Sequence, residues 1–309
     1  MSMTDVIQTE NLTKHYGEVH AADDVNLCIK KGEIYGFLGL NGAGKTTTIR
    51  MLLGMIRPTR GIVYLFGKKA VQGDKNLWNR VGHLVEIPYS YPELTVLENL
   101  EIFRRLRFLR DAGLLNKLME ELNLIPYKNI KAKNLSLGNA QRLGIAKAMI
   151  HRPDLLILDE PANGLDPAGI VQIREILIDL ALNHGVTIFL SSHILGEISR
   201  FATRIGIIHE GRMVKESEVD TLEKSRYRAL HVNTLDNAKA FDIISKHNFS
   251  PVILPEGTIE LKGDRAILHP EEISALLSGQ GLPPTEIVLN EENLEHYFLR
   301  IIQTNGKKS

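Results

Sequence analysis

The feature that most constrains this chain is a glycine-rich stretch placed between an apolar segment and a helix-forming segment. It has the pattern G-x-x-x-x-G-K-[ST], which is typical of a loop that binds phosphate between a strand and a helix. Glycines let the backbone curl so that successive N–H groups point at phosphate oxygens, and the following helix adds unpaired N–H groups and the positive end of its dipole. The residues expected to hold phosphate are Gly39, Leu40, Asn41, Gly42, Ala43, Gly44, Lys45, Thr46 and Thr47.

Two side chains in this stretch carry chemistry of their own. Lys45 supplies a mobile cation for the phosphates, and Thr46 supplies a hydroxyl oxygen for Mg²⁺. The plain alternative is a glycine-rich turn that only closes a strand–helix unit. The Lys-Thr pair and the flanking strand and helix signals disfavour that alternative.

Two further apolar segments end in polar residues that suit hydrolysis. Asp159 and Glu160 directly follow the apolar segment 155–158, and His193 follows the apolar segment 186–190 after two serines. The carboxyl ends of parallel strands meet at one rim of a sheet, so these side chains are expected to lie together. Asp159 is then placed to hold Mg²⁺, Glu160 to orient or deprotonate the attacking water, and His193 to reach a γ-phosphate or that water.

A second helix start has the features of an anion-binding site. Ser136 and Gly138 open the helical segment that begins near Leu135. A helix start of this kind presents unpaired N–H groups to an anion, although on its own it is only a helix cap.

Composition excludes several classes of function. Among 309 residues, Lys and Arg together number 37 and Asp and Glu together also number 37, so no net charge favours nucleic acid or an anionic membrane. The single cysteine, Cys28, excludes an intrachain disulfide. No signal peptide and no run of about 18 apolar residues is present. We therefore expect a cytoplasmic protein with no nucleic-acid partner; at a membrane, another chain must supply the spanning segments.

The order of apolar segments predicts the fold. Continuous apolar strands alternate with helices in residues 1–226, which predicts an α/β phosphate-loop domain with a mixed sheet, antiparallel edge strands and a helical subdomain at about residues 88–150. Residues 227–309 follow the order β-α-β-β-α-β, which predicts a small α+β ferredoxin-like domain. Its last helix is expected to begin with Asn290 as the capping residue.

Together these motifs resemble the ATP-binding subunit of an ABC transporter over roughly residues 5–225. The segment Leu135–Arg142 resembles the family's signature, usually Leu-Ser-Gly-Gly-Gln, and Gly164-Leu165-Asp166 resembles its D-loop. His193 matches the switch histidine, and Tyr16 matches the aromatic residue that stacks on adenine.

The resemblance implies Mg²⁺-dependent ATP hydrolysis by a head-to-tail pair of copies. In such a pair, the signature helix of one copy, with Ser136 and Gly138, caps the γ-phosphate held by the phosphate loop of the other. The D-loop residue Asp166 is also expected to bind nucleotide. Glu86 stands where the family usually has a glutamine, and with Thr46 and Asp159 it would surround Mg²⁺, with Glu160 as the base and His193 sensing the γ-phosphate.

The resemblance also implies a polytopic membrane permease as partner. The subunit would then work as a peripheral protein at the cytoplasmic face of the cell membrane, and residues 88–93 are expected near the permease. The chain departs from the usual signature at Leu137 and Asn139.

A narrower resemblance points to antibiotic export. Glu86 followed by Ile-Pro, the segment Ser191–Leu195 and the segment Leu294–Phe298 are similar to the ATPase subunits of bacitracin exporters and lantibiotic self-immunity exporters. The expected function is therefore export of a peptide antibiotic or similar amphipathic compound. Two alternatives stay open: a soluble regulatory or translation-associated ABC ATPase without a permease, and a module in which residues 228–309 sense a ligand and ATP acts as a switch.

Overall fold

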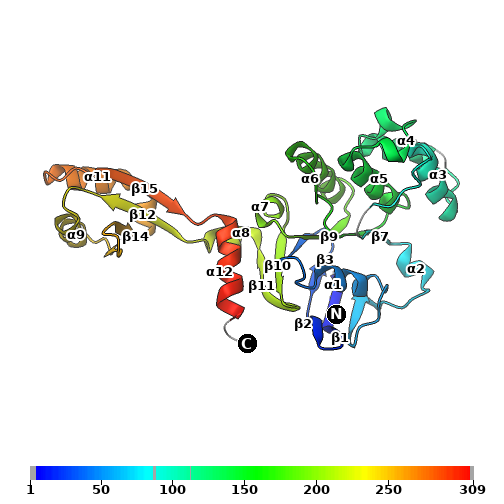
Figure 1. The fold of residues 1–309 in the computed structure, drawn as a ribbon, viewed down its shortest axis with the longest axis horizontal. Coiled ribbons are helices and arrows are strands. Elements are labelled where there is room, and N and C mark those ends of the chain that lie inside the picture. The colour runs from blue at the N-terminus through cyan, green and yellow to red at the C-terminus, as the bar shows by residue number, and fades with distance from the viewer. Residues whose placement is uncertain (1–4, 86–87, 112, 307–309) are drawn as a thin grey trace. The chain divides into compact units, whose positions relative to one another are not determined.

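The computed structural model describes residues 5–85, 88–111 and 113–306, and Figure 1 shows its ribbon. Contacts within these ranges divide the chain into two compact units. The first holds the described residues up to Val219 and those from Ile301 onward, and the second is Asp220–Arg300. Each unit has its own hydrophobic core. The expected domain boundary between residues 226 and 227 stays a prediction.

A mixed six-stranded sheet forms the centre of the first unit, in the order β11-β10-β4-β9-β8-β7. All neighbouring pairs are parallel except β10 and β11, which form an antiparallel hairpin. β4, β8 and β9 are buried along their whole length, as continuous apolar strands covered on both faces should be. The strands are β4 (Ile34–Leu38), β7 (Val81–Leu84), β8 (Leu155–Leu158), β9 (Thr187–Ser192), β10 (Arg204–His209) and β11 (Arg212–Glu218).

A second, antiparallel sheet supplies the expected edge strands. β1 pairs with β2, β3 and β5, and β5 pairs with the short β6. The helix α1 (Lys45–Leu52) lies on the side of the central sheet that faces these strands, as Figure 1 shows. The strands are β1 (Asp5–Tyr16), β2 (Val19–Val25), β3 (Cys28–Lys30), β5 (Arg60–Leu65) and β6 (Lys68–Lys69).

Helices cover the opposite side of the central sheet. α5 packs against α3, α4 and α6, and Thr95 and Glu98 form a capping box that fixes the start of α3. The described residues between 95 and 130 form α3, α4 and a short 3₁₀ turn. These helices are α3 (Val96–Leu106), α4 (Gly113–Glu121), α5 (Leu137–Met149), α6 (Pro167–Leu182) and α7 (Leu195–Ile198); the 3₁₀ turns are Ile125–Tyr127 and Ala132–Asn134. The short helix α2 (Lys75–Trp78) instead packs in the core that contains α1.

The second unit is an antiparallel sheet with the order β13-β14-β12-β15. This is the ferredoxin-like strand order, and residues of the sheet pack with α9, α10 and α11 in one core. The elements are α8 (Val219–Lys224), which spans the division between the units, β12 (Arg228–Asn233), α9 (Asn237–Lys246), β13 (Pro251–Ile253), β14 (Ile259–Leu261), α10 (Asp264–Leu268), α11 (Pro270–Gly279), β15 (Glu286–Glu291) and α12 (Leu294–Gly306), which also spans the division.

The predicted start of the last helix is wrong. Asn290 does not cap a helix; it lies in β15, opposite Ala229 of β12. Pairing with β12 keeps the backbone extended through Glu291, so α12 begins at Leu294. The side-chain oxygen of Asn293 accepts a hydrogen bond of 2.7 Å from the N–H of His296, which is the bond that the sequence analysis assigned to Asn290.

Candidate active site

The phosphate loop joins the buried strand β4 to the first residue of α1. Gly44, the residue before α1, has φ of 106°, and no side chain caps this helix. A Cβ atom on Gly44 would lie only 2.2 Å from the carbonyl oxygen of Ala21 on β2. Glycine is therefore required here by both the backbone conformation and the close approach of β2. The result is a helix start that keeps its N–H groups for an anion.

Lys45 lies almost buried at the base of this loop. Its side chain is 6% exposed, and its Nζ donates hydrogen bonds to the carbonyl oxygens of Gly39 at 2.8 Å and Leu40 at 3.3 Å. The same Nζ lies 3.1 Å from Oε1 of Glu160. These three partners fix the ammonium inside the curl of the loop.

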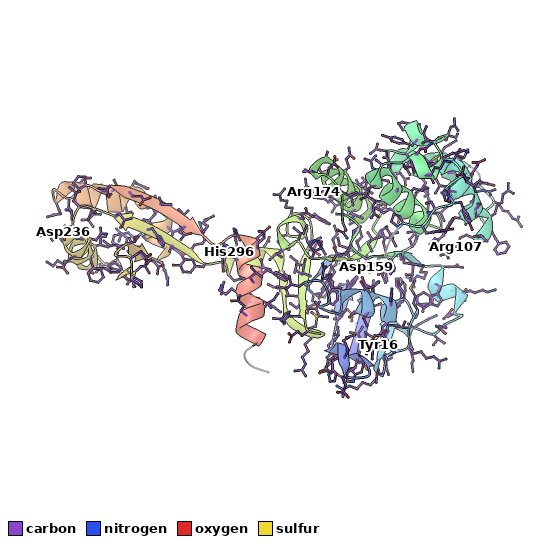
Figure 2. The ribbon with its side chains drawn as sticks, viewed as in Figure 1. Tyr16, Arg107, Asp159, Arg174, Asp236 and His296 are labelled. Carbon is purple, nitrogen blue, oxygen red and sulfur yellow. The ribbon has the colours of Figure 1, made fainter. Side chains whose placement is uncertain are left out.

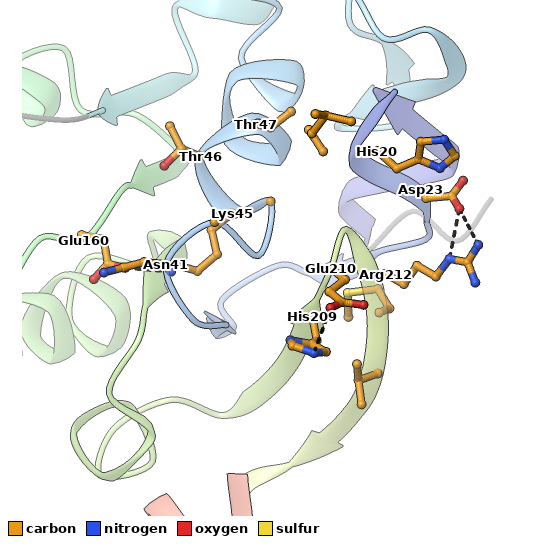
Figure 3. Close-up of a pocket in the computed structure, with 16 residues that line it drawn as sticks. His20, Asp23, Asn41, Lys45, Thr46, Thr47, Glu160, His209, Glu210 and Arg212 are labelled. Atoms are coloured by element: carbon orange, nitrogen blue, oxygen red, sulfur yellow. Dashed lines mark hydrogen bonds and ion pairs between the residues drawn. The ribbon is translucent and has the colours of Figure 1, made fainter. Parts of the chain in front are cut away.

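Glu160 connects the phosphate loop with the histidine that follows β9. Its second oxygen, Oε2, lies 2.9 Å from Nδ1 of His193. The backbone φ of Glu160 is 49°, an uncommon conformation for a residue that has a side chain. The structure thus brings Lys45, Glu160 and His193, from three separate strand ends, into one continuous set of contacts. Figure 3 draws Lys45 and Glu160 among the residues that line the pocket at the phosphate loop.

Ser191 is a residue that the sequence analysis missed. Its hydroxyl donates to Oδ1 of Asp159 at 2.6 Å and accepts from the backbone N–H of Glu160 at 2.9 Å. Asp159 is only 4% exposed, so this hydrogen bond orients a buried carboxylate. The pairing of β8 with β9 places Leu158 opposite Leu190, and the next residues on the two strands are Asp159 and Ser191. Knowing that β8 and β9 are neighbours in the sheet would have predicted this contact.

A cavity of about 800 Å³ opens in front of the phosphate loop. One wall is formed by the loop with α1 and Glu160, as expected. The opposite wall was not predicted, because it comes from β2 and from the β10–β11 hairpin, which are distant in sequence (Figure 3). Its members include Val19, His20, Asp23, Glu210 and Arg212.

Arg212 connects the β10–β11 hairpin to β2 in this second wall. Its guanidinium donates to Oδ2 of Asp23 at 2.9 and 3.0 Å. This hydrogen bond, with the charge of Arg212, holds the pKa of Asp23 below its usual value despite partial burial. The wall therefore presents an ion pair rather than a free carboxylate.

Tyr16, predicted to stack on adenine, lies at the end of β1. Its side chain is half exposed, and Nζ of Lys14 lies 5.0 Å from the centre of its ring. Figure 2 shows Tyr16 on the antiparallel sheet and Asp159 on the central sheet. In the described part of the chain, Val19 and His20 line the cavity on this side and Tyr16 does not. Its role as the adenine platform stays a prediction.

The second helix start lies apart from this cavity. Ser136 caps α5 by accepting from the N–H of Asn139 at 3.3 Å, and Asp166 caps α6 by accepting from the N–H of Gly169 at 2.9 Å. Gly138 and Leu165 are close neighbours, as are Leu137 and Gly164. The predicted signature and D-loop residues therefore form one patch, and none of them lines the cavity in the described residues.

Of the three predicted Mg²⁺ ligands, two can be placed. Thr46 lines the cavity, and Asp159 is held by Ser191 at the end of β8. Hydroxyl and carboxylate oxygens are the ligands that Mg²⁺ prefers, so this donor set fits the ion. Glu86 lies outside the described residues.

The segment that follows residue 87 is attached to α5 by a buried lysine. Nζ of Lys147 donates to the carbonyl oxygen of Tyr89 and to Oγ of Ser90, and it lies 5.2 Å from the centre of the Phe103 ring. Burial lowers the pKa of Lys147 to about 8. The Tyr89 side chain is 75% exposed. The segment is thus anchored from inside while it presents an aromatic ring outward.

A curled glycine loop before a helix, a lysine buried in that loop and acidic residues at the end of a neighbouring strand define a P-loop nucleoside triphosphatase. Comparison with known proteins narrows this class. Residues 22–163 match the family described as ABC transporter. The bacitracin transport ATP-binding protein BcrA is 42% identical in Enterococcus faecalis, covering 99% of both chains, and 39% identical in Bacillus licheniformis, covering 97% of this chain and 98% of that one.

Two other similar proteins match only about 70% of this chain, which corresponds in length to the first unit, called the ATPase unit below. The lantibiotic transport ATP-binding protein SrtF of Streptococcus pyogenes is 38% identical over 71% of this chain and 93% of its own. The dimeric post-hydrolysis structure of the ATP-binding cassette MJ0796, bound to ADP and Pi, matches with a TM-score of 0.62 and 27% identity, covering 69% of this chain and 98% of that one. The chain belongs to the ATP-binding subunits of the ABC transporter family, and it is an ATPase.

None of the helices in the described residues combines the length and the apolar character needed to cross a bilayer.

Proposed function

We propose that this protein hydrolyses ATP to power export of a peptide antibiotic, or a similar amphipathic compound, through a separate membrane permease. The observation that carries this proposal is similarity to bacitracin transport ATP-binding proteins along almost the entire chain, including the second unit. By contrast, two solved ABC cassettes that it resembles cover only about 70% of this chain.

The side chains have separate roles in the proposed reaction. The loop amides and Lys45 bind the phosphates, which draws the ammonium away from Glu160. The freed carboxylate of Glu160 accepts a proton from the attacking water, and His193, 2.9 Å from Oε2, keeps that carboxylate in place and contacts the γ-phosphate. Bound Mg²⁺, held by Thr46, Asp159 and Glu86, would neutralise charge on the phosphate oxygens.

The proposed active unit is a head-to-tail dimer. Ser136, Gly138 and Asp166 lie together but away from the cavity, so in one copy they have no nucleotide to contact. A second copy would bring its patch over the first copy's cavity and close it over the γ-phosphate. ATP favours this closed form and hydrolysis opens it, because ATP and ADP differ in affinity for the two states.

The proposed permease contact is the segment at Tyr89, and it would place the protein at the cytoplasmic face of the membrane. Lys147 fixes this segment to α5, the same helix that begins with Ser136. Movement of the helix start on dimer closure therefore has a direct path to the proposed membrane contact.

The test is resistance in a sensitive bacterium that expresses this protein with a candidate permease, a polytopic membrane protein encoded beside it in the genome. We expect bacitracin or lantibiotic resistance that is lost in Lys45→Ala, and crosslinks from Tyr89→Cys to the membrane protein. Glu256→Cys, on an exposed turn of the second unit, is the control position for crosslinking. Copurification with ribosomes and no membrane-associated fraction would contradict the proposal and favour a soluble regulatory ATPase.

A further inference from the structure

A pair of histidines and an aspartate meet on the β1–β2 hairpin beside the cavity. His15 on β1 lies directly opposite His20 on β2, and their rings stack with centroids 3.9 Å apart. Asp23 lies further along β2. One ligand atom of each of these three residues lies within 4.8 Å of the other two. The ATPase mechanism uses neither His15 nor this grouping.

One atom in the group lacks a partner. Nε2 of His15 is buried and makes no hydrogen bond in the structure, and it lies 3.9 Å from Oδ1 of Asp23, beyond hydrogen-bond distance. A buried polar atom without a partner is unfavourable, so such an atom calls for an explanation. A metal ion between the imidazole and the carboxylate would provide one, since a neutral imidazole nitrogen and a carboxylate oxygen are both metal ligands.

We propose that His15, His20 and Asp23 bind a zinc ion, with water in the fourth position. Two imidazole nitrogens and one carboxylate oxygen suit zinc, whereas Mg²⁺ prefers an all-oxygen set. Stacked rings cannot both direct a nitrogen lone pair at one ion, so binding requires one ring to turn. His20 is exposed on the hairpin surface and is the ring that would turn, while His15 is more buried and stays in place.

The neighbouring cations set a limit on affinity but leave one oxygen for the metal. Arg212 occupies Oδ2 of Asp23 at 2.9 Å, and the guanidinium of Arg60 lies 3.5 Å from Oδ1. The Oδ1 atom faces His15, and the weaker contact with Arg60 is the one that a metal ion would replace. Figure 3 shows Asp23 between His20 and Arg212.

Metal binding here acts on the nucleotide site. His20, Asp23 and Arg212 all line the cavity, so turning His20 and adding a cation beside Arg212 changes the wall opposite the phosphate loop. Zinc therefore changes the affinity for ATP. This consequence rests on the proposed function, whereas the metal site itself does not.

The site is tested by calorimetric titration of the full chain with zinc chloride, without nucleotide. We expect one site whose affinity falls at least about tenfold in His15→Ala and in His20→Ala. His184→Ala is the matched control, because His184 also lies beside an aspartate, 3.5 Å from Asp179, and its loss should leave the affinity unchanged. Equal zinc affinity in a His15→Ala/His20→Ala double variant, or no binding by the unmodified protein, overturns the proposal.

Two further measurements show whether a loss of zinc binding comes from misfolding, and whether zinc affects ATP binding through this site. Cobalt titration of the unmodified protein should give visible absorption bands that zinc abolishes, so the site is testable even if a variant misfolds; their absence counts against it. ATP affinity is then measured with and without zinc in the unmodified protein and in His15→Ala, because zinc also binds free ATP. A zinc effect on ATP affinity of the same size in both proteins overturns the link to nucleotide binding. Absence of ATP binding in metal-free and Mg²⁺ buffers alike would count against the proposed function instead.

Discussion

The starts of α1 and α5 are both helix N-termini suited to anions, yet they differ in how complete they are. At α1 no side chain caps the helix, Lys45 is 6% exposed, and Glu160 and His193 already contact one another around it. At α5 the cap is Ser136, and Leu137 beside it is 46% exposed. The comparison teaches that one anion site is assembled within the chain, while the other is a surface that, in our proposal, a second copy completes.

The largest effect is expected at the assembled site. Glu160→Gln removes the proton acceptor but keeps the shape of the side chain, so ATP turnover should fall about 10²–10⁴-fold while ATP stays bound. Phosphate release and nucleotide binding measure the two effects separately. Glu175→Gln, on the exposed face of α6, is the control. Turnover in Glu160→Gln equal to that of the control would refute the role of Glu160 as the base.

Replacing one glycine at the start of α1 and one at the start of α5 by alanine tests the comparison between the two sites. Gly44→Ala places a Cβ 2.2 Å from a backbone oxygen at a φ of 106°, so it should cost at least about 1–3 kcal/mol of stability and weaken ATP binding. Gly138→Ala meets only Leu165 at 3.8 Å, so the fold and ATP binding to single copies should persist while hydrolysis falls. Thermal unfolding and analytical ultracentrifugation with ATP distinguish the two. Comparable destabilisation in both variants would break the comparison.

Ser191→Ala tests whether the Ser191 hydroxyl stabilises Asp159 and Glu160 at the assembled site. Loss of the hydroxyl leaves the buried Asp159 without its hydrogen bond and the N–H of Glu160 without its acceptor, at a cost of about 1–3 kcal/mol in urea unfolding. Ser192→Ala is the comparison, because that hydroxyl accepts only from the N–H of Ile194 among the hydrogen bonds described. An equal loss in the two variants would mean that Ser191 has no special role.

The last expected effect is on the pH dependence of stability and concerns the far end of α5. Burial lowers the pKa of Lys147 from 10.5 to about 8, so between these values the unfolded chain binds more protons than the folded one. Stability should therefore rise with pH in this window, by up to about 1.4 kcal/mol per pH unit, relative to Lys147→Met. Urea unfolding from about pH 8 to about pH 10 measures this. The exposed Lys117→Met should show no such trend, and parallel pH profiles for Lys147→Met and the unmodified protein would contradict the expectation.

The sequence predicted the parts of the site that follow directly from one strand end. Lys45 belongs to the glycine-rich loop pattern, whereas Asp159 and His193 each follow an apolar strand. Parallel pairing of the strands brought the three together at one rim of the sheet. The fold class was predictable for the same reason, because continuous apolar runs need a sheet covered on both faces.

The missed features depend on contacts between segments with no local signal. Ser191 can bond to Asp159 only because β9 lies beside β8. Arg212 bonds to Asp23, although the two residues are separated in sequence by almost the whole length of the ATPase unit. The predicted start of α12 is too early, because the preference of asparagine for helix caps contains no information about the pairing of Asn290 with β12. Tertiary pairing overrode local propensity in each case.

The wall built by the β10–β11 hairpin also bears on how the protein is made. Strand β4, which leads into the phosphate loop, pairs with β9 and β10, and the cavity includes Val214 of β11. A ribosome will therefore have synthesised the loop long before the strands that support and face it. A nascent chain that stops short of β11 carries the phosphate-binding sequence without a finished nucleotide site.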